Sequence, residues 1–288
     1  VFSGLHSPPL LANRAFINER GILVLDPWAA AGPITRYPSS TNWIFRLSVD
    51  DSKAGYVIAK YAVETRGFKQ PALLLEETGW GKSNDRTMNA ALKTYGLEPV
   101  ITKWFNWNLK DNGARIMLRE IITKGADSIF LVANAPEGKT FVRAMASLPA
   151  EMRVPICSHW GITGGDFSET IGLDIRRKID LHFIQTRFSF MNHRESEMGN
   201  RVFAQAVKLF PESIAVREDI RAPAGFIHGY DLTRILIAAV EQCGLSGDML
   251  ADRNAVRDAL ETLHVPVHGL IKTYEQPFRV FGPEHPDA

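Results

Sequence analysis

The sequence predicts an α/β protein of two lobes, in which parallel sheets are flanked by helices and a hinge joins the lobes. Short, nearly continuous apolar runs alternate with stretches of helical period, which is typical of parallel strands covered on both faces. From residue 100 onward these runs recur about every 26–29 residues, the length of a βα unit. The length of 288 residues corresponds to about two domains.

The elements follow in order along the first two thirds of the chain. Strands are predicted at 22–25, 72–75, 100–105, 128–132, 154–157 and 181–184. Between them, helices are predicted around Val57–Ala62, Met88–Tyr95 and Ile116–Ile122. Each is followed by a glycine (Gly67, Gly96, Gly125), which ends a helix because it adopts the left-handed conformation at little cost. Asp50 and Asp51 are placed to cap the first of them.

The rhythm changes after Ile184, and helices are predicted over 195–209, 225–242 and 254–263. The change favours lobes that are discontinuous in sequence. We expect the first lobe to comprise residues 1–47 and 188–265, without its first βα units. The second lobe is expected to comprise residues 48–187 and 266–288.

The composition excludes several classes of protein. Hydrophobic residues make up 45% and charged residues 23%, as in ordinary globular proteins. The net charge is +1 with no basic block, which argues against a nucleic-acid partner. No apolar run approaches the roughly 18 residues of a membrane span. The two cysteines, Cys157 and Cys243, are too few for a disulfide scaffold.

No motif supports catalysis, a cofactor or a metal ion. The segment GWGKS at 79–83 departs from the P-loop pattern, because Glu76 stands where that pattern needs glycine. The loop GITGG at 161–165 lacks the dinucleotide-binding spacing. Cys157 and His159 are too few for a zinc site. Nucleophile-elbow and HExxH motifs are absent. We therefore predict a protein that is not an enzyme.

Two early loops favour binding of a small molecule. Ser7 precedes a predicted helix, so its hydroxyl is either a helix N-cap or part of a carboxylate site formed with the helix amides. Trp28 and Ala29–Ala31 follow a predicted strand. The small residues let backbone amides approach a ligand, although a plain loop is an equally good interpretation.

Further candidates follow strands of the second lobe. Glu137 is either an acid favoured by the first turn of a helix or an anchor for a ligand ammonium. Trp80 and Trp160, like Trp28, lie on loops at the carboxyl ends of strands, where open α/β sheets bind ligands. Indole rings are suited to lining a closed pocket.

Five segments follow one another in an order typical of one family. They are GLHSP at residues 4–8, GILVLDPWAAAGPIT at 21–35, FRLSVD at 45–50, WG at 80–81 and YDL at 230–232. Together they resemble the type I periplasmic solute-binding proteins. The nearest branch is the leucine/isoleucine/valine-binding proteins of ABC importers.

The resemblance implies two lobes that close over a small-molecule ligand, with the membrane subunits of an ABC importer as partner and the bacterial periplasm as location. It places His6, Ser7 and the backbone of Ala29–Ala31 at the ligand carboxylate, and Trp80 on the ligand from the other lobe. Glu137, Trp160 and Gly161 lie near further contact positions. The resemblance also places Cys157 and Cys243 in different lobes, so both are expected as free thiols. A ligand-sensing domain of a signalling receptor shares this fold and stays an alternative, and an α/β enzyme is a weaker one.

This chain departs from the family at two positions that bear on the ligand. Alanines occupy Ala29–Ala31, where the family usually carries a hydroxyl side chain, and Trp160 stands where an acid often binds the ligand ammonium. With three tryptophans and no acid there, the sequence predicts a small apolar or aromatic carboxylate. A branched-chain amino acid is the competitor, with Glu137 as its ammonium anchor.

Overall fold

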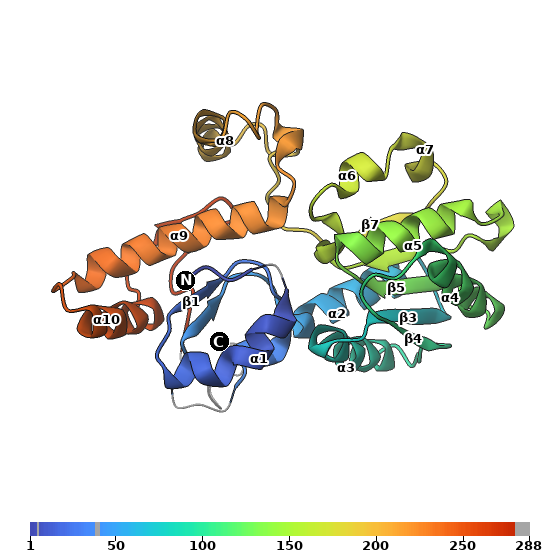
Figure 1. Cartoon of the computed structure of the whole chain (residues 1–288), viewed down its shortest axis with the longest axis horizontal. Coiled ribbons are helices and arrows are strands. Elements are labelled where there is room, and N and C mark those ends of the chain that lie inside the picture. Colours follow the sequence, from blue (N-terminus) through green and yellow to red (C-terminus); the bar gives the residue numbers. More distant parts are fainter. Residues whose placement is uncertain (5, 38–40, 280–288) are drawn as a thin grey trace. The chain divides into compact units, whose positions relative to one another are not determined.

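The computed structural model describes residues 1–4, 6–37 and 41–279, which form two compact units (Figure 1). The first unit comprises Val1–Val49 and Thr186–Ala288, and the second comprises Asp50–Gln185. The chain thus passes between the units at two points. Both points lie within two residues of the boundaries expected from the sequence.

The second unit is built on a five-stranded, wholly parallel sheet in the order β4-β3-β5-β6-β7. All five strands overlap apolar runs from which strands were predicted. Their bounds are β3 Pro71–Glu76, β4 Thr102–Phe105, β5 Ser128–Val132, β6 Ile156–Ser158 and β7 Leu181–Phe183. The helices are α2 Asp51–Lys60, continued by a π-helical turn to Thr65, α3 Gly79–Lys93, α4 Asp111–Thr123, α5 Ala135–Ser147, α6 Phe167–Thr170 and α7 Leu173–Arg176.

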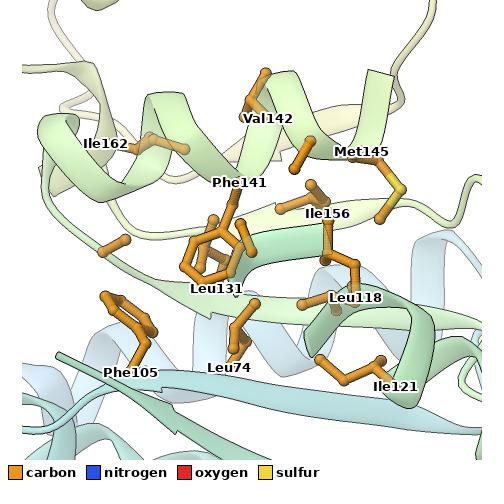
Figure 2. Close-up of a cluster of buried hydrophobic side chains, with 14 of the residues drawn as sticks. Leu74, Phe105, Leu118, Ile121, Leu131, Phe141, Val142, Met145, Ile156 and Ile162 are labelled. Atoms are coloured by element: carbon orange, nitrogen blue, oxygen red, sulfur yellow. The ribbon is translucent and has the colours of Figure 1, made fainter. Parts of the chain in front are cut away.

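A hydrophobic core joins this sheet to α4 and α5 (Figure 2). Leu118 of α4 and Phe141 of α5 are fully buried against strand residues such as Leu131. The rings of Phe141 and Phe105 meet edge to face, with 4.9 Å between their centroids. Full burial of such side chains is the main stabilising term for the sheet.

The predicted helix ends of this unit are confirmed. Asp50 is the N-cap of α2, and its carboxylate accepts a hydrogen bond from the backbone N–H of Ser52 at 2.8 Å. Gly67, Gly96 and Gly125 each follow a helix with positive φ. This is the conformation for which glycine was expected at these places.

The first unit has a smaller parallel sheet. Strand β1 (Val24–Asp26) pairs with β2 (Ile44–Arg46), and Phe2 adds a parallel bridge to Leu25. Strand β2 was not predicted, because its short run merges with the expected crossover between lobes. The other elements are α1 Ser7–Glu19, α8 Glu197–Leu209, α9 Pro223–Cys243, α10 Met249–Glu261, and the antiparallel β8 Val267–His268 and β9 Thr273–Tyr274.

The tail after Pro266 belongs to the first unit, which corrects its expected placement in the second lobe. Buried Asp231 of α9 accepts hydrogen bonds from the amide of Leu270 at 2.6 Å and from the Tyr274 hydroxyl at 2.9 Å. Phe278 packs edge to face on Phe45. Residues 280–288 of the predicted tail lie outside the described residues.

Two further observations concern the whole of the described chain. Cys157 and Cys243 are free thiols, one in each unit, and burial raises the pKa of the Cys157 thiol to about 12. Among the helices in residues 1–4, 6–37 and 41–279, none is both long and apolar enough to cross a membrane.

Candidate functional site

The ten residues predicted to bind ligand fall into two groups, one in each unit. His6, Ser7, Trp28 and Ala29–Ala31 belong to the first unit. Trp80, Glu137, Trp160 and Gly161 belong to the second. We call these groups the amide loop and the aromatic wall, respectively. Each is a local arrangement that its own unit builds.

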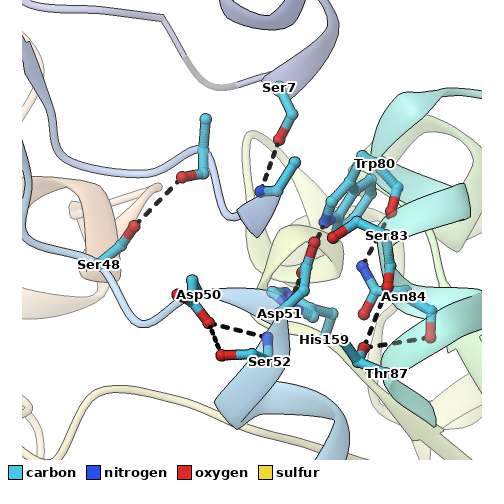
Figure 3. Close-up of polar contacts among 12 residues, drawn as sticks. Ser7, Ser48, Asp50, Asp51, Ser52, Trp80, Ser83, Asn84, Thr87 and His159 are labelled. Atoms are coloured by element: carbon cyan, nitrogen blue, oxygen red, sulfur yellow. Dashed lines mark hydrogen bonds and ion pairs between the residues drawn. The ribbon is translucent and has the colours of Figure 1, made fainter. Parts of the chain in front are cut away.

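In the amide loop, Ser7 is not the helix N-cap. The N-cap of α1 is His6, which makes no side-chain cap, and Ser7 is the first helical residue. The Ser7 side chain is buried, and its Oγ accepts a hydrogen bond from the backbone N–H of Ala31 at 3.2 Å (Figure 3). Because the oxygen accepts this bond, the hydroxyl proton is available to donate to another group.

Asp26, at the end of β1, binds the backbone of the amide loop. Its Oδ1 accepts hydrogen bonds from the backbone N–H groups of Trp28 at 3.1 Å and Ala29 at 2.8 Å. The carboxyl is completely buried. Burial raises its pKa, and the positive charge of Arg46 together with the loop hydrogen bonds opposes that rise. Asp26 thus defines the course of residues 27–29.

Arg46 and Ser48 hold the carbonyl side of the same loop. The Arg46 guanidinium donates to the carbonyl of Ala31 at 2.7 Å, and the Ser48 hydroxyl donates to the carbonyl of Ala29 at 3.5 Å. Ala29, Ala30 and Ala31 are all buried. Within the described residues, the Ala30 N–H makes no hydrogen bond, which leaves one loop amide for a ligand. Three alanines in sequence therefore reflect a backbone site with no room for larger side chains.

Trp28 is 3% exposed and packs against α9. A Cβ on Gly225 would lie 2.7 Å from the Trp28 ring, so glycine is required there for close approach. One turn later, the Nδ1 of buried His228 is 3.0 Å from the carbonyl of Pro27. Burial lowers the pKa of His228 to about 4. This histidine is therefore neutral at physiological pH.

In the aromatic wall, Trp80 lies in the first turn of α3. Thr78 is the N-cap and accepts from the N–H of Gly81. A Cβ at Gly81 would collide with the carbonyl oxygen of Glu76. Glycine is therefore needed after Trp80, because α3 begins in close contact with the end of β3. Trp80 is 3% exposed, and its indole Nε1 donates to Asp51 Oδ1 at 3.2 Å (Figure 3).

Trp160 and Gly161 begin a short helical turn after β6. Trp160 is buried. A Cβ at Gly161 would lie 3.1 Å from the tip of the Trp80 indole and 2.9 Å from Asn134 Oδ1. Trp80 therefore lies directly over the Gly161 backbone. The structure thus brings three of the four predicted residues of the second unit together.

Glu137 has a structural partner. Its Oε1 accepts a hydrogen bond from the backbone N–H of Asn108 at 2.9 Å, and the side chain is buried. Asn108 has a φ of 63°, a conformation that asparagine tolerates better than most residues. The first-turn acid of α5 therefore stabilises a left-handed residue in the loop between β4 and α4. Of the two interpretations left open by the sequence, this contact favours the structural one.

Two cavities, one inside each unit, are lined by residues other than those predicted to bind ligand. In the first unit a groove of about 760 Å³ lies between α8 and α9, lined by residues such as Val202, Phe226 and Tyr230. In the second unit a cavity of about 260 Å³ lies beside α2 and is lined by Tyr61, Cys157 and other residues. Among the described residues, no three His, Cys, Asp or Glu side chains form a possible metal site.

The sequence missed the residues that hold the two groups in place. Asp26 and Arg46 were seen only as parts of the family resemblance, Asp51 only as a helix cap, and His159 only as half of a poor zinc motif. The signal of Arg46, Asp51 and His159 was weak because their partners lie far away in sequence, whereas Asp26 contacts Trp28 and Ala29 close by. A charged residue inside an otherwise apolar strand end, such as Asp26, is the one cue that was available, since isolated buried charges are costly.

A bilobed α/β chain whose binding candidates lie in loops at the carboxyl ends of parallel strands is the architecture of a ligand-binding protein of the periplasmic type. The chain belongs to the periplasmic binding protein family, whose sequence pattern it matches over residues 1–285. No curated protein sequence gives a significant match.

Three solved structures illustrate the similarity of fold. A type 1 periplasmic binding protein of Bordetella pertussis Tohama I is 20% identical, with a TM-score of 0.75 over 96% of this chain and 72% of that one. A solute-binding protein of an ABC transporter from R. palustris, in complex with benzoate, is 17% identical, with a TM-score of 0.76 over 95% and 69%. A leucine-binding protein of Thermotoga maritima is 16% identical, with a TM-score of 0.71 over 90% and 67%.

Proposed function

We propose that this chain is the solute-binding receptor of an ABC importer in the bacterial periplasm and that its ligand is a small aromatic or apolar carboxylate. The observation that carries the ligand class is the amide loop. There, the Ser7 hydroxyl accepts from Ala31 and keeps its own proton, and the Ala30 N–H adds a second donor. Two hydrogen-bond donors suit a carboxylate, whose oxygens only accept.

Solved structures of similar fold support this choice. Solute-binding proteins of ABC transporters with TM-scores of 0.71–0.76 to this chain are complexes with benzoate, 4-hydroxybenzoate and 3,4-dihydroxybenzoic acid. In our proposal, Trp80 and Trp160 supply the apolar surface for such a ring. Leucine, bound by another protein of this fold, is the competing ligand. It is less favoured because Glu137 already bonds to Asn108 and no acid stands at Trp160.

Titration calorimetry with benzoate and with leucine tests the proposal. We expect benzoate to bind and Ser7→Ala to weaken it about ten- to a hundredfold, because a charge-assisted contact contributes about 1.5–3 kcal/mol. Ser189→Ala is a matched control, since Ser189 is a serine of the same unit whose hydroxyl likewise accepts a hydrogen bond from a backbone N–H, that of Met191, at 3.2 Å. Benzoate binding that Ser7→Ala leaves unchanged would remove the carboxylate site. Tight leucine binding lost in Glu137→Gln would overturn the ligand class.

A further inference from the structure

A buried acid and a buried histidine lie directly behind the aromatic wall. Asp51 is the first residue of α2, and His159 follows β6. Both side chains are 0% exposed. The His159 Nε2 is 3.3 Å from Asp51 Oδ1, the same oxygen that accepts from the Trp80 indole. One carboxylate oxygen therefore serves two rings (Figure 3).

His159 also packs against both tryptophans of the wall. Its ring meets Trp80 edge to face, with 5.3 Å between centroids and 88° between planes. It lies 3.9 Å from the Trp160 ring at a 47° tilt. His159 thus packs on both indoles, and its Nε2 lies at ion-pair distance from Asp51.

This arrangement is expensive for a protein interior. Burying a carboxylate is unfavourable unless hydrogen bonds and opposite charge compensate, and an apolar pair of similar volume often packs at least as stably. Among the described residues, Asp51 Oδ2 and both ring nitrogens of His159 have no hydrogen-bond partner, because the 3.3 Å contact between His159 Nε2 and Asp51 Oδ1 has the distance of an ion pair but not the geometry of a hydrogen bond. Stability of the fold is therefore a poor account of the pair, whereas directional contacts to Trp80 are something apolar residues cannot provide.

We propose that Asp51 and His159 are positioning residues that set the planes of the Trp80 and Trp160 indoles, and through them make the receptor prefer flat carboxylates over aliphatic ones of equal size. This inference rests on the proposed function. Aromatic rings interact through defined offset or edge-to-face geometries, so a wall with fixed ring planes favours a flat ligand. A wall whose rings can turn repacks around either shape.

The first test needs no ligand. The indole N–H of Trp80 gives its own signal in a ¹⁵N–¹H NMR spectrum, assigned by its loss in Trp80→Phe. We expect Asp51→Leu, which keeps the branched shape of the side chain and removes the acceptor, to shift this signal and speed its hydrogen exchange about tenfold or more. Asp51→Asn keeps an oxygen acceptor and should retain slow exchange. A Trp80 signal that is the same in Asp51→Leu and wild type overturns the proposed contact.

The second test measures specificity with two probes, benzoate and cyclohexanecarboxylate, which share a carboxylate on a six-membered ring but differ in flatness. We expect the wild-type protein to prefer benzoate, and both Asp51→Leu and His159→Phe to reduce the preference about three- to tenfold, the size of an aromatic-pair contribution. His159→Phe keeps a ring between the indoles, so it remains informative if Asp51→Leu folds poorly.

Asp231→Asn is the matched control, because it alters a buried acid of the first unit that bonds to Leu270, Ile271 and Tyr274. It should leave the preference unchanged. If the wild-type protein binds neither probe, the proposed function fails and the inference fails with it. If the wild type prefers benzoate and His159→Phe shows the same preference, the inference alone is overturned.

Discussion

The amide loop and the aromatic wall are both buried and rigid, but different forces hold them. In the amide loop, Asp26, Arg46 and Ser7 bond to the backbone, so peptide groups are fixed in place. In the aromatic wall, Asp51 and His159 fix side-chain rings. A backbone site tolerates little change in nearby side-chain size, whereas a ring site depends on a few polar atoms behind it. The two units should therefore respond differently to substitution.

We expect the largest loss of stability from a substitution at Gly81, the residue after Trp80 of the aromatic wall. In Gly81→Ala the new methyl group would collide with the carbonyl of Glu76 and displace the start of α3, which carries Trp80. We expect the free energy of unfolding of the second unit to fall by about 3 kcal/mol or more, measured by urea denaturation. Gly172→Ala is the control, because its Cβ would meet no atom within 4 Å. Equal stability of both variants would refute the collision.

Removing the support of the amide loop should cost somewhat less. Asp26→Ala leaves the buried N–H groups of Trp28 and Ala29 without their acceptor. An unsatisfied buried donor costs about 1–3 kcal/mol, so we expect a loss of about 2–3 kcal/mol and weaker benzoate binding. Denaturation and calorimetry measure the two effects. Benzoate affinity equal to wild type would show that the loop keeps its course without Asp26.

The stability of the first unit should also depend on pH, through His228. His228 titrates at about 4 when folded, because burial lowers its pKa, whereas an unfolded histidine titrates near 6.5. The unfolded state then binds the extra proton, so this contribution to stability is complete above about pH 6.5 and declines as the pH falls toward 4.

We expect His228→Asn, which keeps a donor toward Pro27, to lose less stability on acidification than the wild type, by about 1.4 kcal/mol at pH 5.5. Denaturation at pH 7.5 and 5.5 gives the difference. The raised pKa values of Asp26 and Asp231 act in both proteins and cancel in the comparison. Parallel pH profiles for the two proteins would contradict the assignment to His228.

The smallest effect is expected at Glu137. Glu137→Gln keeps an oxygen acceptor for the N–H of Asn108, so the loss of stability should be below about 1 kcal/mol. Benzoate has no ammonium, and its affinity should not change. If calorimetry shows that Glu137→Gln binds benzoate tenfold more weakly, Glu137 takes part in ligand binding.

The sequence predicts the second unit well because its apolar runs recur at regular spacing with helices between them. All five strands of its sheet and the glycine helix ends were found this way. Strand β2 was missed because its run merges with the expected crossover between the lobes. The placement of residues 266–279 was missed because the tail is held by single long-range contacts such as Tyr274 to Asp231. Pattern alone identifies which loops lie at the sheet edge, but long-range contacts decide what supports them.

The hydrogen bond from Ala31 to Ser7 uses one lone pair of the hydroxyl oxygen and leaves the hydroxyl proton for another partner. In our proposal, this proton and the Ala30 N–H both go to the ligand carboxylate. A primary amide can accept the same two bonds through the two lone pairs of its carbonyl oxygen. Hydrogen bonds to a charged acceptor are about twice as strong as those to a neutral one, so we expect charge, and not the direction of the hydrogen bonds, to make the amide loop prefer benzoate over benzamide.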